Sequence, residues 1–350
     1  MMSLDGLLAA VSAADPRARA LAQRHLDGLT KPVGSLGRLE EIAARLVMLT
    51  GLAPRVSAPV VFTFAADHGV VAEGVSAYPQ SVTAQMVENF LRGGAAINVL
   101  ARQAGARVVV ADFGVANPIA AVAGLVRVSH GAGTQNIVRG PAMTRAQAIA
   151  AVEAGAHLAE EAVAAGADLL ATGDMGIGNT TAASAMIAAI TGASPETVTG
   201  HGTGVDEAGR RVKVEAVRRA LAVNAPDGAD GVDVVAKVGG FEIAGLMGVI
   251  LAGAAHRVPV ALDGFVSGAA AVAALTLAPA ARDALFASHR STEPGHDVAL
   301  RHLGLVPYLD LSMRLGEGTG AALFIHLARA AALAYSEMAT FKSAGVDTRS

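Results

Sequence analysis

Continuously apolar runs alternate with segments of helical periodicity through the middle of this chain. Each run ends at or just before Asp or Gly, which is typical of strands buried on both faces; the runs lie at 60–66, 107–112, 167–172, 232–238 and 258–262. Predicted helices lie between them, at roughly 80–104, 144–165, 180–191, 206–223, 241–254 and 266–278. The alternation predicts an α/β fold in which crossover helices join parallel strands.

Polar residues gather where these predicted strands end. Asp67-His68, Asp112, Asp174 and Asp263 all fall at predicted strand C-termini. Ligands of open α/β sheets bind at that edge, so the recurrence favours a site there. Asp is also a common turn and helix-capping residue, and that simpler explanation stays open.

The two ends of the chain do not join the alternation. Residues 4–30 and 38–50 are predicted to be helical, as is a stretch at about 320–340. We expect the segments 1–55 and 320–350 to pack together as a small helical subdomain. Residues 56–319 are then an α/β domain with a Rossmann-like, doubly wound parallel sheet flanked by helices.

Composition narrows the classes of function. The 350 residues carry a formal net charge of −3 and no basic stripe with interleaved aromatics, which argues against a nucleic-acid partner. The chain has no Cys, so disulfides and thiolate sites are excluded. Its ten His residues show no metal-ligand spacing. The apolar run 243–255 is too short for a membrane span and the first 20 residues lack a signal-peptide pattern, so we expect a cytoplasmic protein.

The segment 168–189 holds the most specific local pattern. An apolar run leads into three glycines, then into Asn and two Thr, and then into an Ala-rich helical stretch. This order suits a phosphate, because the first N–H groups of a helix have no internal partner. No Gly-Lys-[Ser/Thr] follows, so the loop is not a Walker A motif, and Thr181 stands where a dinucleotide fingerprint has its third glycine. A tight turn without a ligand is the alternative.

A second candidate is Glu317 in the segment Gly-Glu-Gly-Thr-Gly at 316–320. The flanking glycines leave its carboxylate accessible to a ligand, and an apolar helix follows. A carboxylate among apolar neighbours tends to have a raised pKa, which suits a general base. The alternative is an exposed loop carboxylate or a capping residue.

Further short motifs occur along the chain in a fixed order. They are Lys-Pro-Val-Gly-Ser-Leu-Gly at 31–37, Ala-Ala-Asp-His-Gly-Val at 65–70, Val-Thr-Ala-Gln-Met at 82–86, Lys-Val-Gly-Gly-Phe-Glu-Ile at 237–243, Leu-Asp-Gly-Phe-Val-Ser at 262–267 and Ser-His-Arg-Ser-Thr-Glu at 288–293. Together with the segments 173–181 and 314–322, they resemble the nicotinate-nucleotide:dimethylbenzimidazole phosphoribosyltransferase family of cobalamin biosynthesis. The resemblance covers roughly residues 20–340, and several ordered motifs are far more specific than one glycine loop.

The resemblance implies transfer of phosphoribose from nicotinate mononucleotide to a benzimidazole, with release of nicotinate and inversion at the anomeric carbon. The pyridinium leaves as a neutral group, whereas the ring N–H of the acceptor must lose a proton. One general base is therefore the minimum requirement, and Glu317 is the candidate; Asp174 is the second catalytic candidate. No metal or redox cofactor is implied.

It also implies two sets of binding residues in the domain 56–319. The phosphoribosyl group would contact Gly176, Ile177, Gly178, Asn179, Thr180, Gly202, Lys213, Asp263, Gly264 and Ser291. The base would lie in an apolar slot formed by Tyr78, Pro79, Gln85, Met86, Met175 and Leu315. Without the resemblance, Lys213 is better explained as a solvated helix residue, and the glycines around 202 fit an ordinary turn equally well.

The family often carries Glu where this chain carries Asp174. The aspartate side chain is one methylene shorter, so its reach and the preferred base can differ. Purines and phenols therefore stay open as acceptors beside 5,6-dimethylbenzimidazole.

Two rival hypotheses belong to other classes. A catalytically silent nucleotide-binding protein would have the same fold, but the intact Gly-Glu-Gly segment argues against it. An NAD-dependent dehydrogenase is disfavoured because the glycine pattern is incomplete and lies in mid-chain. The resemblance further implies a homodimer whose other partners are small molecules, with neither nucleic acid nor membrane among them.

Overall fold

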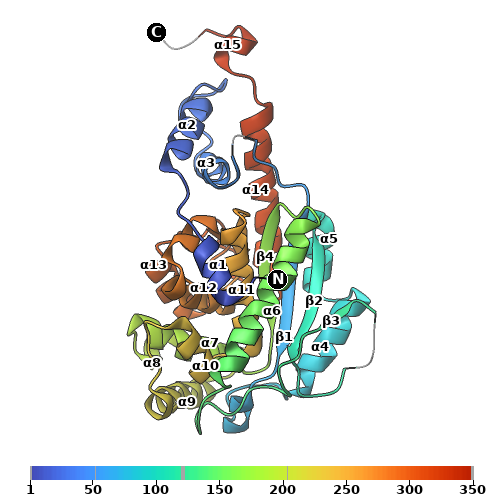
Figure 1. The fold of residues 1–350 in the computed structure, drawn as a ribbon, viewed down its shortest axis with the longest axis vertical. Helices are drawn as coiled ribbons and strands as arrows, with labels where there is room; N and C mark the ends of the chain where they lie inside the picture. The colour runs from blue at the N-terminus through green and yellow to red at the C-terminus, as the bar shows by residue number, and fades with distance from the viewer. Residues whose placement is uncertain (1, 52, 120–122, 203, 348–350) are drawn as a thin grey trace.

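The computed structural model describes residues 2–51, 53–119, 123–202 and 204–347, and its centre is a six-stranded sheet (Figure 1). The strands are β1 (Pro59–Ala66), β2 (Arg107–Gly114), β3 (Leu125–Arg127), β4 (Leu169–Met175), β5 (Val260–Leu262) and β6 (Leu285–Ala287). They lie in the order β3-β2-β1-β4-β5-β6, and all neighbouring pairs are parallel. This is the order of a doubly wound sheet, in which the winding reverses between β1 and β4. The predicted fold class is confirmed.

Helices surround the sheet. They are α1 (Leu4–Ala10), α2 (Pro16–Asp27), α3 (Arg38–Thr50), α4 (Ser81–Arg92), α5 (Ala96–Ala104), α6 (Arg145–Ala164), α7 (Asn179–Thr191), α8 (Pro195–Val198), α9 (Glu207–Asn224), α10 (Gly231–Val238), α11 (Phe241–Ala255), α12 (Phe265–Leu277), α13 (Pro294–Leu303), α14 (Thr319–Glu337) and α15 (Phe341–Ala344), with 3₁₀ turns η1 (Gly69–Glu73) and η2 (Pro279–Ala284). Within the described residues no helix is long and apolar enough to cross a membrane.

Strand β1 shows why the apolar runs are continuous. Val60, Phe62 and Phe64 belong to the core on one face of the sheet, whereas Val61 and Ala65 belong to the core on the other. The first core includes α6, α10, α11 and α12, and the second includes α3, α5 and α14. Since both faces are covered, the strand is apolar at nearly every position; its one polar residue, Thr63, donates its hydroxyl to the Glu317 carbonyl oxygen.

One predicted strand is wrong. The run 232–238 is helix α10 instead. Periodicity cannot tell a seven-residue apolar run in a strand from one in a buried helix. Asp230 decides the outcome locally, because its side chain accepts hydrogen bonds from the N–H groups of Val232 and Asp233 and so caps the helix. The edge strands β3 and β6, of three residues each, were not expected.

The helices from the two chain ends lie partly together. Helix α3 packs against both α2 and α14, beyond the edge of the sheet (Figure 1). Helix α1 packs instead on α6 and α11 in the main core. The division into a helical subdomain (1–55 with 320–350) and an α/β domain (56–319) stays a prediction, and residues 1, 52 and 348–350 of that subdomain lie outside the described residues.

Candidate active site

A pocket of about 280 Å³ opens at the carboxyl edge of the sheet, where the winding reverses. The loops that follow β1, β4, β5 and β6 contribute to its wall, as does the segment before α14. Predicted site residues that line it are Tyr78, Asp174, Met175, Gly176, Ile177, Asn179, Thr180, Gly202, Gly264, Ser291 and Leu315. Residues distant in sequence therefore meet in one cavity, at the edge that the strand ends indicated.

The glycine-rich loop forms one end of the pocket. Gly178 is the N-cap of α7 and has a left-handed backbone (φ 96°), and none of the described side chains hydrogen-bonds to this cap. A side chain at this position would be strained by that φ and would also meet Val71 at 2.8 Å. Asn179 and Thr180, the first two residues of the helix, line the pocket. The start of α7 is therefore open toward a ligand, as an anion site requires.

Lys213 on α9 lies behind this helix terminus. Its side chain is buried, and its Nζ donates a hydrogen bond to Thr180 Oγ1 at 3.0 Å. Burial lowers the pKa of Lys213 to about 8, and the nearby negative charge of Glu293 opposes the shift. The ammonium thus reaches the pocket through Thr180, although Lys213 does not itself line the wall.

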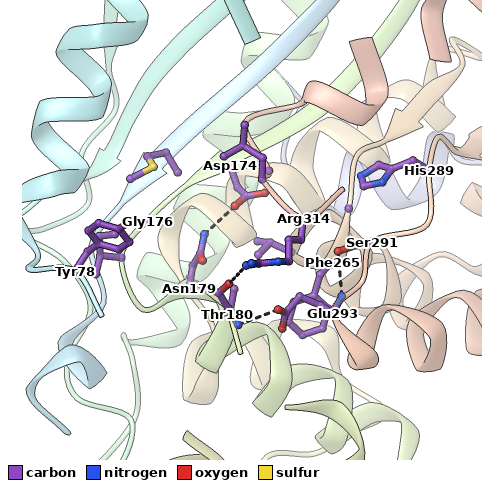
Figure 2. Close-up of a pocket in the computed structure, with 17 residues that line it drawn as sticks. Tyr78, Asp174, Gly176, Asn179, Thr180, Phe265, His289, Ser291, Glu293 and Arg314 are labelled. Carbon is purple, nitrogen blue, oxygen red and sulfur yellow. Dashed lines mark hydrogen bonds between the residues drawn. The ribbon is translucent and has the colours of Figure 1, made fainter. Parts of the chain in front are cut away.

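Gly202 is held by hydrogen bonds on both sides of its Cα atom. Its N–H donates to Glu293 Oε1 at 2.8 Å, and its carbonyl oxygen accepts from Arg314 Nη1 at 2.8 Å. Figure 2 shows Glu293 and Arg314 converging beside Thr180. Both charged side chains come from segments beyond β6, so this end of the pocket joins three distant parts of the chain.

Two carboxylates lie at the other end. Asp174, at the end of β4, accepts a hydrogen bond from Asn179 Nδ2 at 2.8 Å (Figure 2). Burial raises the pKa of Asp174 well above its ordinary value, and the nearby charges of Asp263 and Glu242 raise it further. A proton therefore binds to this group more readily than to a carboxyl group in water.

Glu317 lies beside Asp174 in space, and a backbone hydrogen bond joins the two residues. Its N–H donates to the Asp174 carbonyl oxygen at 3.1 Å, and its Oε2 accepts from the N–H of Ile97, near the start of α5, at 3.2 Å. Burial raises the pKa of Glu317, and the Ile97 N–H partly opposes the shift. The residue also has a left-handed backbone, with φ at 64°. Glu317 itself lies just outside the residues that line the cavity, next to Gly316, which does line it.

Asp263 has a different environment from the one expected of a ligand contact. Its carboxylate accepts from the N–H groups of Gly318, Gly320 and Ala321 at 3.1, 2.7 and 3.2 Å. The side chain is fully buried and does not line the pocket. In this structure Asp263 holds the start of α14, and with it the loop that carries Glu317.

Other predicted residues lie outside the pocket wall: Pro79, Gln85, Met86, Gly178, Lys213, Asp263 and Glu317. Pro79 and Gln85 are exposed, whereas Met86 packs on the same core as Met175. The assignments of these residues to substrate binding stay predictions.

Six residues that line the pocket were not among the predicted site residues: Phe265, Val266, His289, Glu293, Arg314 and Gly316. All six lie inside segments that carried the family resemblance. Nothing in the one-dimensional pattern separated them from their neighbours, because their importance comes from contacts with other loops, such as that of Glu293 with Gly202.

Comparison with known proteins agrees with this geometry. A family model described as phosphoribosyltransferase matches residues 11–346. Relatives named nicotinate-nucleotide–dimethylbenzimidazole phosphoribosyltransferase include one from Desulforudis audaxviator, 56% identical with 95% of this chain and 94% of the relative covered. Another, from a Roseiflexus species, is 55% identical with 99% and 98% covered.

Solved structures are similarly close. The crystal structure of CobT from Thermus thermophilus superposes with a TM-score of 0.92 at 52% identity, covering 95% of this chain and 100% of that one. A second structure from the same organism, titled as the nicotinate-nucleotide–dimethylbenzimidazole enzyme, has a TM-score of 0.91 at 50% identity over 96% of this chain and 100% of its own. The chain belongs to the nicotinate-nucleotide–dimethylbenzimidazole phosphoribosyltransferase family.

Proposed function

We propose that this protein transfers 5-phosphoribose from nicotinate mononucleotide to 5,6-dimethylbenzimidazole or a related base. The products are the α-ribazole 5′-phosphate and nicotinate, and the reaction serves cobalamin nucleotide-loop synthesis. One observation carries the proposal: a single pocket at the switch point joins an open helix terminus, suited to phosphate, with the buried carboxyl group of Asp174, and Glu317 lies directly behind the wall at that end.

The phosphate of the nucleotide binds at the start of α7. Residues 176, 177, 179 and 180 of the loop line this end of the pocket, and Thr180 and Lys213 supply a hydroxyl and a cation. Gly202, Gly264 and Ser291 surround the ribose. This places the anomeric carbon toward the Asp174 end of the pocket.

The chemistry needs one proton acceptor. An imine-type nitrogen of the benzimidazole forms the new bond to the anomeric carbon while the bond to the pyridinium nitrogen breaks, and nicotinate leaves with a neutral ring nitrogen. The N–H on the second benzimidazole nitrogen then loses its proton to Glu317. A carboxylate whose pKa is raised by burial is better matched to this task than an exposed one. Asp174, the second catalytic candidate, lines the pocket at the same end.

The acceptor base lies between Tyr78, Met175 and Leu315. Tyr78 and Leu315 are exposed in this structure, with relative accessibilities of 52% and 58%. Gln85 and Met86 on α4 lie outside the pocket wall, and their part in binding the base is proposed from the family resemblance alone. Because Asp174 is shorter than the Glu often found in the family, the acceptor test below includes related bases.

The reaction is tested directly by chromatography. Purified protein is incubated with nicotinate mononucleotide and 5,6-dimethylbenzimidazole, and both products are quantified. We expect a benzimidazole ribotide with the α configuration and an equal amount of nicotinate. Nucleotide binding without nicotinate release, with a panel of benzimidazoles, purines and phenols, would favour the catalytically silent binding protein.

We also infer a homodimer, which the family resemblance supports. Two exposed apolar residues between α13 and α14, Val306 and Leu311, would be covered by a second subunit. Size-exclusion chromatography with light scattering gives the mass that decides between one subunit and two. A cytoplasmic location is the matching expectation for an enzyme of small charged metabolites, and cell fractionation tests it.

A further inference from the structure

We propose that Glu293 is a positioning residue of this pocket: it holds the Gly202 N–H, and with it the backbone that packs against the Lys213 ammonium, in place for the phosphate of the nucleotide. The assignment depends on the proposed function, because it concerns how that phosphate is bound. Glu293 was not among the predicted site residues, because its contact with Gly202 joins segments that are 91 positions apart in the chain.

Glu293 has an unusual relation to its own helix. It occupies the N-cap position of α13, but in the described structure its side chain makes no capping hydrogen bond to that helix. The side chain crosses instead to the next loop, where Oε1 accepts from Gly202 N–H at 2.8 Å. The carboxylate is closely packed there, since a Cβ on Gly200 would lie 2.3 Å from Oε2. Glu293 is only 6% exposed, and it lines the pocket.

The Gly202 peptide connects Glu293 to the phosphate end. Gly202 has a left-handed backbone (φ 54°), and a Cβ there would meet Lys213 Nζ at 2.5 Å and Thr180 Oγ1 at 2.8 Å. Arg314 holds Gly202 from its other side, through the carbonyl oxygen. A displacement of Glu293 would therefore move the peptide that lies directly against the lysine ammonium.

Charge gives Glu293 a second effect on Lys213. Glu293 is the carboxylate that opposes the burial-induced fall of the Lys213 pKa. Carboxylates on other elements packed against α9 are already paired: Glu73 of η1 with Arg219, Glu196 of α8 with Arg218, and Asp233 of α10 with Lys237. Arg314, which also lies at this end of the pocket, is a cation and does not favour the ammonium form of Lys213.

The second carboxylate oxygen fits the same interpretation. Within the described part of the chain, Glu293 Oε2 is buried and has no hydrogen-bond partner. A buried carboxylate oxygen without a hydrogen-bond partner costs stability, so its presence calls for an explanation. Here the unpaired negative charge keeps the lysine protonated before substrate binds, so that the cation is ready when a phosphate arrives.

The test is calorimetric titration of the unmodified protein and its variants with nicotinate mononucleotide between pH 7 and 9. Over this range the phosphate is already a dianion, because its second pKa is about 6. Binding to the unmodified protein should weaken as the pH passes about 8, where Lys213 loses its proton. Glu293→Gln retains an oxygen that can accept from Gly202 but removes the charge, so the decline should begin at lower pH and affinity at pH 8 should fall about tenfold.

Glu293→Asp separates reach from charge. The shorter carboxylate keeps its charge but no longer reaches Gly202 with the same geometry. We expect weaker binding at every pH, with the pH at half-loss unchanged. Thermal unfolding of each variant reports whether it is folded, and if the glutamine variant fails to fold, the aspartate variant still tests the positioning.

Two controls complete the design. Glu207→Gln removes an exposed carboxylate from the same helix as Lys213 and should leave the profile unchanged. Lys213→Arg carries a charge that does not titrate in this range, so adding Glu293→Gln to it should not change the pH dependence. A Glu293→Gln profile that superposes on that of the unmodified protein, or a shift that persists beside Lys213→Arg, would overturn the proposal. Failure of the unmodified protein to bind the nucleotide would instead contradict the proposed function.

Discussion

Helices α7 and α14 begin in nearly the same way but have different surroundings. Each follows a Gly-x-Gly turn and has a glycine N-cap with a left-handed backbone, Gly178 at φ 96° and Gly318 at φ 97°. At α14 the buried Asp263 accepts three N–H groups from the first turn and the N-cap. At α7 none of the described side chains caps the helix, and its first residues line the pocket.

The difference lies in what occupies the helix terminus. The N-termini of α7 and α14 both present N–H groups that have no partner inside the helix, and both carry partial positive charge. At α14 the Asp263 carboxylate occupies the helix N-terminus and fixes the loop that carries Glu317. Where the end is left open, the same geometry is available to a phosphate. One structural motif thus serves for holding a catalytic group and for binding a substrate.

The largest expected effect is on turnover, and it comes from Glu317 in the loop that precedes α14. Glu317→Gln should reduce turnover by about 10²–10⁴-fold, because the amide cannot accept the proton. Calorimetric binding of nicotinate mononucleotide should be unchanged, since the phosphate end is intact. Glu337→Gln, an exposed carboxylate at the far end of α14, is the matched control. Turnover within tenfold of the unmodified enzyme would assign the proton transfer to another group.

Removing the internal carboxylate should come next. Asp263→Ala leaves three N–H groups of α14 without a partner, and we expect the free energy of unfolding to fall by about 3 kcal/mol. Denaturant titration measures the loss. Asp206→Ala, which removes an exposed N-cap from α9, should cost only about 1 kcal/mol. Equal losses would show that the buried end is no more important than an ordinary cap.

At the open end the effect should be on binding. Lys213→Ala should weaken the affinity for nicotinate mononucleotide by roughly 10–30-fold at pH 7, because a charge-assisted contact is lost. The difference should shrink above pH 8, where the lysine of the unmodified protein becomes neutral. Calorimetry at both pH values tests this, and a loss that is equal at pH 7 and pH 9 would contradict it.

The smallest expected effect is a change in melting temperature on substitution of Asp174. The pKa of Asp174 is raised, so the folded protein binds this proton more tightly than the unfolded chain does, and that stabilisation is lost as pH rises through the raised pKa. Asp174→Asn should therefore raise the melting temperature by about 2 °C at pH 8 and change it little at acidic pH, where both side chains are neutral.

Asp297 provides the control of opposite sign. The Arg290 hydrogen bond lowers the pKa of Asp297, so this carboxylate contributes stability above its unfolded pKa that is lost as pH falls. Asp297→Asn should lower the melting temperature slightly at pH 8. A gain from both variants would indicate a general effect of charge removal rather than one of the buried site.

Much of the architecture could be predicted because it depends on local pattern. The runs at β1, β2, β4 and β5 are buried on both faces, and their apolar residues record that burial directly. The run at α10 has the same composition, and only the capping contact of Asp230 marks it as a helix. The short edge strands β3 and β6 contain too few residues to show a period.

The site was predictable in part, through the motifs of the family resemblance, but its internal contacts were not. The role of Asp263 at α14 depends on hydrogen bonds across 55 to 58 positions of the chain. Glu293 meets Gly202 across 91 positions. Such contacts follow from how the loops converge at the sheet edge, and no spacing along the sequence records them.

The left-handed backbone of Glu317 has a consequence for protein engineering. Residues other than Gly or Asn are disfavoured at a φ of 64°, so the backbone of Glu317 is locally strained. Glycine would relieve that strain but remove the carboxylate. A library selected only for heat resistance should therefore enrich Gly or Asn at position 317, and its most robust members should be the least active.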